Sequence, residues 1–98
     1  MKIYISGPMT GLFELNFPAF YQCEKRIHEN GHAVVNPARL NVLSGGDWAQ
    51  CMRKDIAELL TCDAIAMLQG WEKSKGALLE RHIAESLGMV ILAEADFE

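Results

Sequence analysis

The side chain in this sequence best suited to chemistry is a glutamate, Glu80, that lies among apolar residues. It falls at helical spacing from Gly76, Ile83, Ala84 and Leu87, so it projects from the apolar face of a predicted helix. Burial raises the pKa of a carboxylate, whereas the dipole at a helix N-terminus lowers it. A desolvated but ionised carboxylate can act as a nucleophile or stabilise a developing oxocarbenium ion, so Glu80 is a catalytic candidate.

Each candidate residue also has a purely structural interpretation. Glu80 could be partly buried and paired with Arg81, Lys75 or a backbone amide. Asp55 lies at the border of the apolar stripe of the preceding helix, where pairing with an adjacent basic residue is the alternative to a role in a site. Tyr4 is either a core residue of the first strand or a hydroxyl donor to a carboxylate on the neighbouring strand–helix unit.

A glycine-bearing loop follows the first predicted strand and contains Ser6, Gly7, Thr10 and Gly11. It has neither a GxGxxG nor a Walker pattern, so the sequence does not support a dinucleotide or triphosphate site. Such a loop could still hold a sugar or a single phosphate. Trp71 follows the third strand, where an exposed indole would serve as an oligomer contact or as a platform on which a base stacks.

Short β-rich runs alternate with helix-patterned segments along the chain. Asn16 and Asp47 are predicted N-caps of the first two helices, and Gly31 and Gly88 are predicted to end the first and third. The alternation predicts a single domain over residues 1–98, a three-layer α/β sandwich of the flavodoxin or Rossmann type. We predict a small parallel sheet of order 2-1-3-4 with strands at residues 2–6, 32–35, 64–68 and 89–92.

In an open parallel sheet, ligands bind beyond the carboxyl ends of the strands, near the point where the strand order reverses. The predicted binding edge comprises residues 6–15, 36–46 and 69–76, and Glu80 follows in the first turns of its helix. Within that edge, the long connection of residues 38–46 could close over a ligand. Asp63 falls at the opposite edge, where we interpret it as a turn or capping residue.

The amino-acid composition limits the kinds of binding partner and the cellular location that can be expected for this chain. A net charge of −4 gives no long-range attraction for polymeric DNA or RNA. Three cysteines at irregular spacing are predicted to be free thiols, and neither a metal nor a cofactor is expected. No secretory signal or long apolar run is present, which predicts no membrane association and a reducing, cytoplasmic location. With 98 residues, 50% of them hydrophobic, the chain is expected to form a homo-oligomer.

Three segments carry a family resemblance that spans most of the chain: IYISGPMTG, RKDIAELLTCDAI and SKGALLERHIAESLGMVIL. Their most specific features are the eight-residue step from Asp55 to Asp63 and the spacing Ser74-x-Gly76-x-x-x-Glu80. Together they resemble the nucleoside 2-deoxyribosyltransferases and the related 2′-deoxynucleoside 5′-monophosphate N-glycosidases. Within that superfamily, the chain looks like a small branch found in phages and bacteria.

The resemblance implies a role for several residues. Glu80 matches the glutamate that attacks the anomeric carbon, and Tyr4 matches a tyrosine that orients that glutamate by hydrogen bonding. Asp55 matches an aspartate that contacts the ligand in the transferases. Ser6 and Gly7 match the first loop, which holds sugar or phosphate. The catalytic set is therefore expected to be Glu80, Tyr4 and Asp55.

The predicted substrate-binding residues come from the same edge of the sheet: Ser6, Gly7, Pro8, Met9, Asn36, Trp71, Ser74 and Gly76. Ser74 stands where the transferases have an aspartate and the monophosphate N-glycosidases have a serine, which favours hydrolysis and room for a phosphate. The transferases also carry a longer C-terminal region that reaches a neighbouring subunit's site, where this chain has only residues 93–98.

The resulting functional hypothesis is cleavage of the N-glycosidic bond of a nucleoside or its 5′-monophosphate, by hydrolysis or by base exchange. No residue of the sequence is an evident general acid for the leaving base. The alternatives are a nucleoside- or nucleotide-binding module without turnover and a small oligomeric scaffold. For the enzyme and for the binding module, the expected partner is a small-molecule nucleoside or nucleotide.

Overall fold

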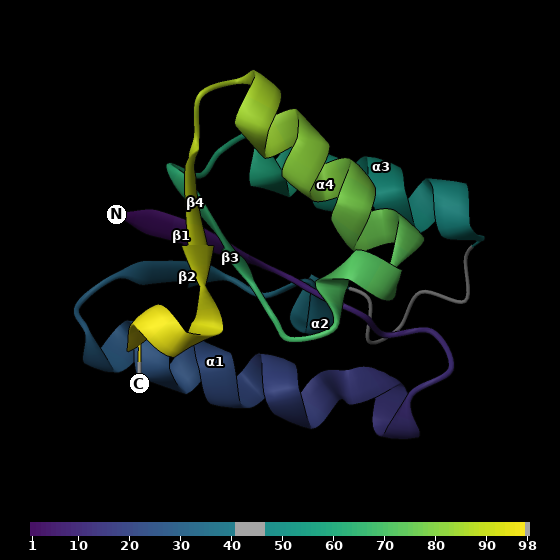
Figure 1. Cartoon of the computed structure of the whole chain (residues 1–98), viewed down its shortest axis with the longest axis horizontal. Coiled ribbons are helices and arrows are strands. Elements are labelled where there is room, and N and C mark those ends of the chain that lie inside the picture. Colours follow the sequence, from purple (N-terminus) through teal and green to yellow (C-terminus); the bar gives the residue numbers. More distant parts are fainter. Residues whose placement is uncertain (41–46, 98) are drawn as a thin grey trace.

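A four-stranded, all-parallel sheet lies between two layers of helices in the computed structural model, which describes residues 1–40 and 47–97 (Figure 1). The strands follow the order β2-β1-β3-β4, so the predicted fold class and strand order are confirmed. Their bounds are β1 (Lys2–Ser6), β2 (Ala33–Val35), β3 (Ala64–Met67) and β4 (Val90–Ala93).

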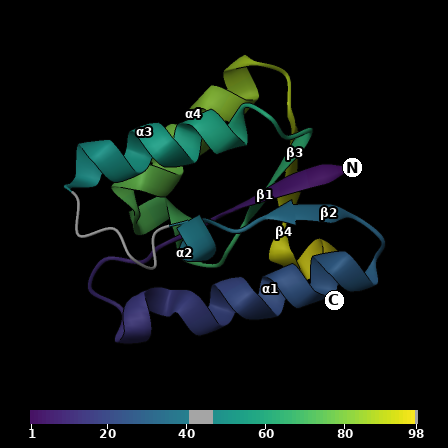
Figure 2. The same ribbon diagram turned by 180° about the vertical axis from the view of Figure 1, so that it is seen from behind.

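The helices divide between the two faces of this sheet. One face is covered by α1 (Phe17–Glu29) and the short 3-10 helix η3 (Glu94–Phe97), and the other by α3 (Trp48–Leu59) and α4 (Lys75–Ser86). Seen from behind, α3 lies in front of α4, and α1 lies with η3 on the opposite side of the strands (Figure 2). The remaining short elements are α2 (Pro37–Leu40), η1 (Phe13–Asn16) and η2 (Trp71–Lys73).

The alternation of side chains along β1 divides the core into two parts. Ile3 and Ile5 point toward α1, where they pack with Phe20 and Ile27. Tyr4 points the other way, into a cluster beneath α3 and α4. Because successive strand residues face opposite sides, every second residue of β1 is presented to the helix that carries Glu80.

The predicted helix ends are confirmed at all four positions, and three of them have the expected capping geometry. Asp47 accepts a hydrogen bond from Gln50 N at 2.8 Å and caps α3. Gly31 and Gly88 follow α1 and α4 with positive φ, as a C′ glycine does. Asn16 occupies the N-cap position of α1 as predicted, but its backbone is left-handed and its side chain does not cap the helix, because its Nδ2 donates to Pro8 O at 2.9 Å.

The long connection after β2 begins as a helical turn, since residues 38–40 belong to α2. The rest of the segment predicted to close over a ligand, residues 41–46, lies outside the described residues. At the other end of the chain, the acidic tail forms η3, and Phe97 packs against the core on the α1 side. Asp63 lies at the amino edge of the sheet as predicted, and its Oδ2 accepts from Lys2 N at 2.9 Å.

Two further features concern membranes and metals. Among the helices described, none combines the length and the apolar character that spanning a bilayer requires. In residues 1–40 and 47–97, no three or more His, Cys, Asp and Glu side chains gather in a way that could hold a metal ion.

Candidate active site

Glu80 lies on the buried side of α4, between Ala77 and Ala84. The helix begins directly after the turn of η2, where Ser74 accepts a hydrogen bond from Ala77 N at 3.1 Å and caps it. Glu80 therefore sits in the second turn and is only 5% exposed. The predicted burial of Glu80 is confirmed, although the buried line runs through Ala77 and Ala84, and Leu87 is 61% exposed.

Two hydroxyl groups of β1 hold the carboxylate of Glu80. Tyr4 donates to Oε2 at 2.5 Å, and Ser6 donates to Oε1 at 2.7 Å. Tyr4 and Ser6 lie two residues apart on one strand, so both face α4, and both are fully buried. A hydrogen bond of this kind to a charged group is about twice as strong as one between neutral groups. Each oxygen of Glu80 thus has its own donor, and the plane of the carboxylate is fixed.

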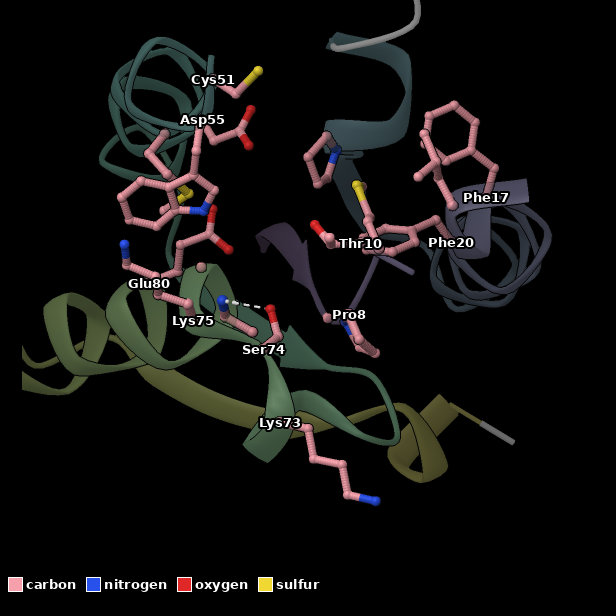
Figure 3. A pocket seen from close by; sticks show the side chains of 18 residues that line it. Pro8, Thr10, Phe17, Phe20, Cys51, Asp55, Lys73, Ser74, Lys75 and Glu80 are labelled. Carbon is pink, nitrogen blue, oxygen red and sulfur yellow. Dashed lines mark hydrogen bonds between the residues drawn. The ribbon is translucent and has the colours of Figure 1, made fainter. Parts of the chain in front are cut away.

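Asp55 reaches the same region from α3 and is 7% exposed. Its negative charge raises the pKa of both Glu80 and Tyr4, so the three residues form one electrostatic group. Figure 3 shows Asp55 and Glu80 pointing into the same cavity from neighbouring helices. The structure therefore brings together Glu80, Tyr4 and Asp55, the residues predicted as a catalytic set from three separate segments.

Burial is the largest influence on the pKa values of Glu80 and Tyr4. It raises the pKa of Glu80 from 4.5 to about 7, although the hydrogen bonds from Tyr4 and Ser6 act in the opposite direction. Burial, followed by the charge of Glu80, raises the pKa of Tyr4 well above its ordinary value. Tyr4 consequently remains a protonated donor, whereas Glu80 exchanges its proton near neutral pH.

A cavity of about 800 Å³ opens beside the carboxylates, a size within the range of small-molecule sites (Figure 3). On the side opposite Asp55 and Glu80 it is closed by Phe17 and Phe20 of α1. The cavity thus has an acidic side and an aromatic side. Its lining residues are Gly7, Pro8, Met9, Thr10, Leu15, Phe17, Phe20, Pro37, Trp48, Cys51, Met52, Asp55, Lys73, Ser74, Lys75, Gly76, Ala77 and Glu80.

Two glycines allow close approach of backbone segments around this cavity. A Cβ on Gly7 would lie 2.6 Å from Leu68 Cβ, so the first loop can pass over the end of β3 only without a side chain. A Cβ on Gly76 would lie 3.1 Å from Met52 Sδ, so this glycine lets the start of α4 approach α3. Both positions support the prediction that these glycines belong to the edge of the site.

The N-terminal ends of α3 and α4 are also joined by a cation–π contact. Lys75 Nζ lies 4.0 Å from the centre of the Trp48 ring, and both residues line the cavity. Lys73, by contrast, extends away from Glu80 and Asp55 (Figure 3). The ammonium group of Lys75 is therefore already engaged with an aromatic ring.

The predicted substrate-binding residues fall into three groups. Gly7, Pro8, Met9, Ser74 and Gly76 line the cavity. Ser6 lies behind the lining and contacts Glu80 instead. Asn36 and Trp71 are not among the lining residues, which differs from the expectation.

The contacts of these last two residues explain their placement. Asn36 is 4% exposed, and its Oδ1 accepts from Ala38 N at 2.9 Å, so it caps the turn of α2. Trp71 packs against the core cluster beneath α4, and the guanidinium of Arg81 lies 4.4 Å from its ring centre. The indole is therefore held by core residues and by Arg81 rather than offered at the binding edge as a stacking platform.

Several walls of the cavity were not identified from the sequence: Phe17, Phe20, Trp48, Cys51 and Met52. Helical periodicity alone assigns such residues to a core stripe, because core and pocket positions on a helix share one spacing. A usable signal existed on α3, where Trp48, Cys51 and Met52 precede Asp55 by seven, four and three residues. No comparable signal pointed to Phe17 and Phe20.

Solved structures with this fold include two enzymes named as deoxyribosyltransferases. A 2-deoxyribosyltransferase from the psychrotolerant bacterium Bacillus psychrosaccharolyticus aligns with a TM-score of 0.76 and 17% identity, over 95% of this chain and 71% of that one. A 2-desoxiribosyltransferase from Leishmania mexicana aligns with a TM-score of 0.72 and 23% identity, over 94% of this chain and 62% of that one. At these identities the likeness establishes a common fold.

Sequence comparison leads to a family rather than to an activity. No curated protein matches the chain. A family model described as "Domain of unknown function (DUF4406)" matches residues 1–93. The chain therefore belongs to the DUF4406 family, and it has the fold of the nucleoside deoxyribosyltransferases.

Proposed function

We propose that the chain cleaves the N-glycosidic bond of a nucleoside or nucleoside 5′-monophosphate, with Glu80 as the nucleophile. The observation that carries this proposal is a buried carboxylate, fixed by Tyr4 and Ser6, that lines a cavity of about 800 Å³. Two enzymes with the same fold are named for deoxyribosyl transfer, which supports chemistry at the same glycosidic bond. The resemblance of the Ser74-to-Glu80 segment to that superfamily supports the role of Glu80.

The proposed reaction has two steps. In the first, one oxygen of Glu80 bonds to C1′ while the bond from C1′ to the base nitrogen breaks, and the bonding electrons leave with the base. The base takes up a proton from solvent as it leaves. In the second step, water or another base attacks C1′ and gives up a proton, while the bond from C1′ to Glu80 breaks and its electrons return to the carboxylate. Water gives hydrolysis, and a second base gives transfer.

Asp55 is proposed to contact the base. Of the residues that line the cavity, Asp55 and Glu80 are those with carboxyl groups, and they project from different helices. The resemblance to the transferases, in which the matching aspartate contacts the ligand, supports this role.

A 5′-monophosphate fits the first turn of α4. Ser74, Lys75 and Gly76 line the cavity there, and the first N–H groups of a helix, together with its dipole, favour an anion. Ser74 Oγ accepts from Ala77 N and retains its own hydrogen for donation to a ligand. These features support a monophosphate over an uncharged nucleoside, and with it the hydrolytic form of the reaction.

The test is a chromatographic assay of free base with a panel of ribo- and deoxyribonucleosides and their 5′-monophosphates. We expect base release from at least one deoxyribonucleoside monophosphate, and a loss of at least about 100-fold in Glu80→Gln. Glu72→Gln makes the same chemical change at an exposed residue of η2 and is the matched control. Circular dichroism of each variant verifies the fold.

Two results would contradict the proposal. One is the absence of base release from every substrate, and the other is release that Glu80→Gln leaves undiminished. If a nucleotide raised the melting temperature of the protein but remained intact, the chain would be a binding module, the alternative function. Thermal shift with the same panel therefore separates binding from turnover.

Self-association is also proposed, because several large apolar side chains remain at the surface. Leu60, Leu87 and Val90 are 56%, 61% and 46% exposed, and they lie where α3 ends, α4 ends and β4 begins. A domain of this size gains stability when such residues are shared with a second copy. Light scattering at micromolar concentration should give at least a dimer, and a monomer would contradict the proposal.

A further inference from the structure

Ser6 differs from the other residues predicted to bind substrate, because it faces Glu80 and not the cavity. Its side chain is fully buried, and it is absent from the residues that line the cavity. Its hydroxyl donates to Glu80 Oε1 at 2.7 Å. A serine hydroxyl has a single hydrogen, so this bond uses the only one that Ser6 could offer to a ligand.

The backbone around Ser6 is fixed as well. Its carbonyl oxygen accepts from Leu68 N at 2.8 Å, just beyond the last residue pair of β1 and β3. Gly7 follows in close contact with the side chain of Leu68. The hydroxyl of Ser6 is therefore presented to α4 by the centre of the sheet, and not by a loop that could turn toward a ligand.

From this geometry we propose that Ser6 is a positioning residue for Glu80 and not a substrate ligand. It acts as the second of two donors, because Tyr4 holds one carboxylate oxygen and Ser6 holds the other. A single donor would leave the carboxylate free to rotate about the bond to that donor, whereas two donors on different oxygens define its plane. The oxygen that attacks and its direction are set by the pair.

Among the described residues, the titratable groups that shift the pKa of Glu80 come from two elements, Tyr4 from β1 and Asp55 from α3. Burial raises the pKa of Glu80 most, and the hydrogen bonds from Tyr4 and Ser6 lower it, while the charge of Asp55 raises it. Removal of the Ser6 hydroxyl takes away one of the two hydrogen bonds that lower the pKa of Glu80, whereas burial and the charge of Asp55 still raise it. The pKa of Glu80 must then rise further, and a smaller fraction is ionised at neutral pH.

The experiment is a pH titration of the Glu80 side-chain carboxyl carbon by NMR in wild type, Ser6→Ala and Ser6→Thr. The signal is assigned as the one that Glu80→Gln removes. We expect Ser6→Ala to raise the pKa of Glu80 by about one unit, a tenfold change in its ionisation equilibrium. Ser6→Thr keeps a hydroxyl donor and should restore a pKa close to that of wild type.

Kinetics add a second readout that rests on the proposed function. In Ser6→Ala, the acidic limb of the kcat/KM profile should move to higher pH with the NMR pKa, and kcat at neutral pH should fall about fivefold, in proportion to the ionised fraction of Glu80. KM should stay within about twofold, because Ser6 does not touch the ligand. A rise in KM without movement of the acidic limb would make Ser6 a substrate ligand and overturn the inference.

The NMR titration measures the pKa of Glu80 whether or not the protein turns over a substrate. If no substrate is turned over, the proposed function fails while the pKa of Glu80 still tests the role of Ser6. An unchanged pKa in Ser6→Ala overturns that role even in an active enzyme. Should Ser6→Ala not fold, Ser6→Cys offers a similar volume and a weaker donor, and the pKa must rise by a smaller amount. No rise in that variant overturns the inference as well.

Discussion

Replacement of Glu80 by glutamine should stabilise the fold, and the gain should increase with pH. In the folded chain the pKa of Glu80 is raised from 4.5 to about 7. Between these values the unfolded chain has released the proton while the folded chain keeps it, so the stability of the wild type falls as pH rises. One pKa unit corresponds to about 1.4 kcal/mol, so ionisation of Glu80 removes about 3 kcal/mol once the pH exceeds 7. Glu80→Gln carries no charge and avoids this loss.

Urea denaturation of wild type and Glu80→Gln measures this effect directly. The stability of the variant relative to wild type should grow by about 3 kcal/mol between about pH 4 and about pH 8.5, with most of the change between the two pKa values. Glu72→Gln, on the surface, provides the pH-dependent baseline of a glutamate-to-glutamine change. If the Glu80→Gln difference were constant with pH, or decreased, the burial of a carboxylate with a raised pKa would be refuted.

Four further outcomes are expected. Base release by the wild type should increase through about pH 7 as Glu80 ionises, in a kcat/KM profile. Tyr4→Phe removes the donor to Glu80 Oε2, so kcat at neutral pH should fall about 10- to 100-fold and recover in part at higher pH. Gly7→Ala places a Cβ 2.6 Å from Leu68 Cβ and should lower the free energy of unfolding by about 1–3 kcal/mol in urea. Asp47→Ala removes the N-cap of α3 and should cost about 1 kcal/mol in the same assay.

The elements that could be predicted from the sequence are those in which local pattern and burial agree. β1 was expected at residues 2–6 and is found there, since a β-rich run ends at Gly7-Pro8. The strand order followed from right-handed crossovers, which leave few arrangements of four parallel strands. Glu80 stood out because a carboxylate on an apolar helix face is costly unless it is hydrogen-bonded, and its partners proved to be on β1.

Other features depend on contacts that no local pattern encodes. Glu14, Leu15 and Asn16 adopt positive φ before α1, a conformation that side-chain types alone do not forecast. Glu24 is buried on α1 because both of its oxygens accept from Arg39, at 2.8 and 2.7 Å, across the gap to α2. That ion pair joins segments 15 residues apart and carries no periodic signature.

In the candidate site, too, some residues could be predicted from their position in the sequence, whereas others are placed by contacts between distant segments. The candidate nucleophile and its first loop could be located from position along a parallel sheet. The aromatic side of the cavity could not, because Phe17 and Phe20 come to line it through the tertiary packing of α1, and no local pattern specifies that packing. The contacts of Trp71 could not be predicted either, because sequence position defines the edge on which a residue lies but not the direction of its ring.

The central place of β1 has a consequence for the order in which the molecule can assemble. β1 is synthesised before β3, yet the two strands pair, and contacts such as that of Lys2 with Asp63 bridge 61 residues. Tyr4 can bind its partner Glu80 only after α4, 76 residues further along, has been synthesised. Closing such long loops slows folding, because the entropy is lost before the contact is gained. A growing polypeptide without α4 contains both hydroxyl donors and no carboxylate for them to hold, so the candidate site arises only in the finished fold.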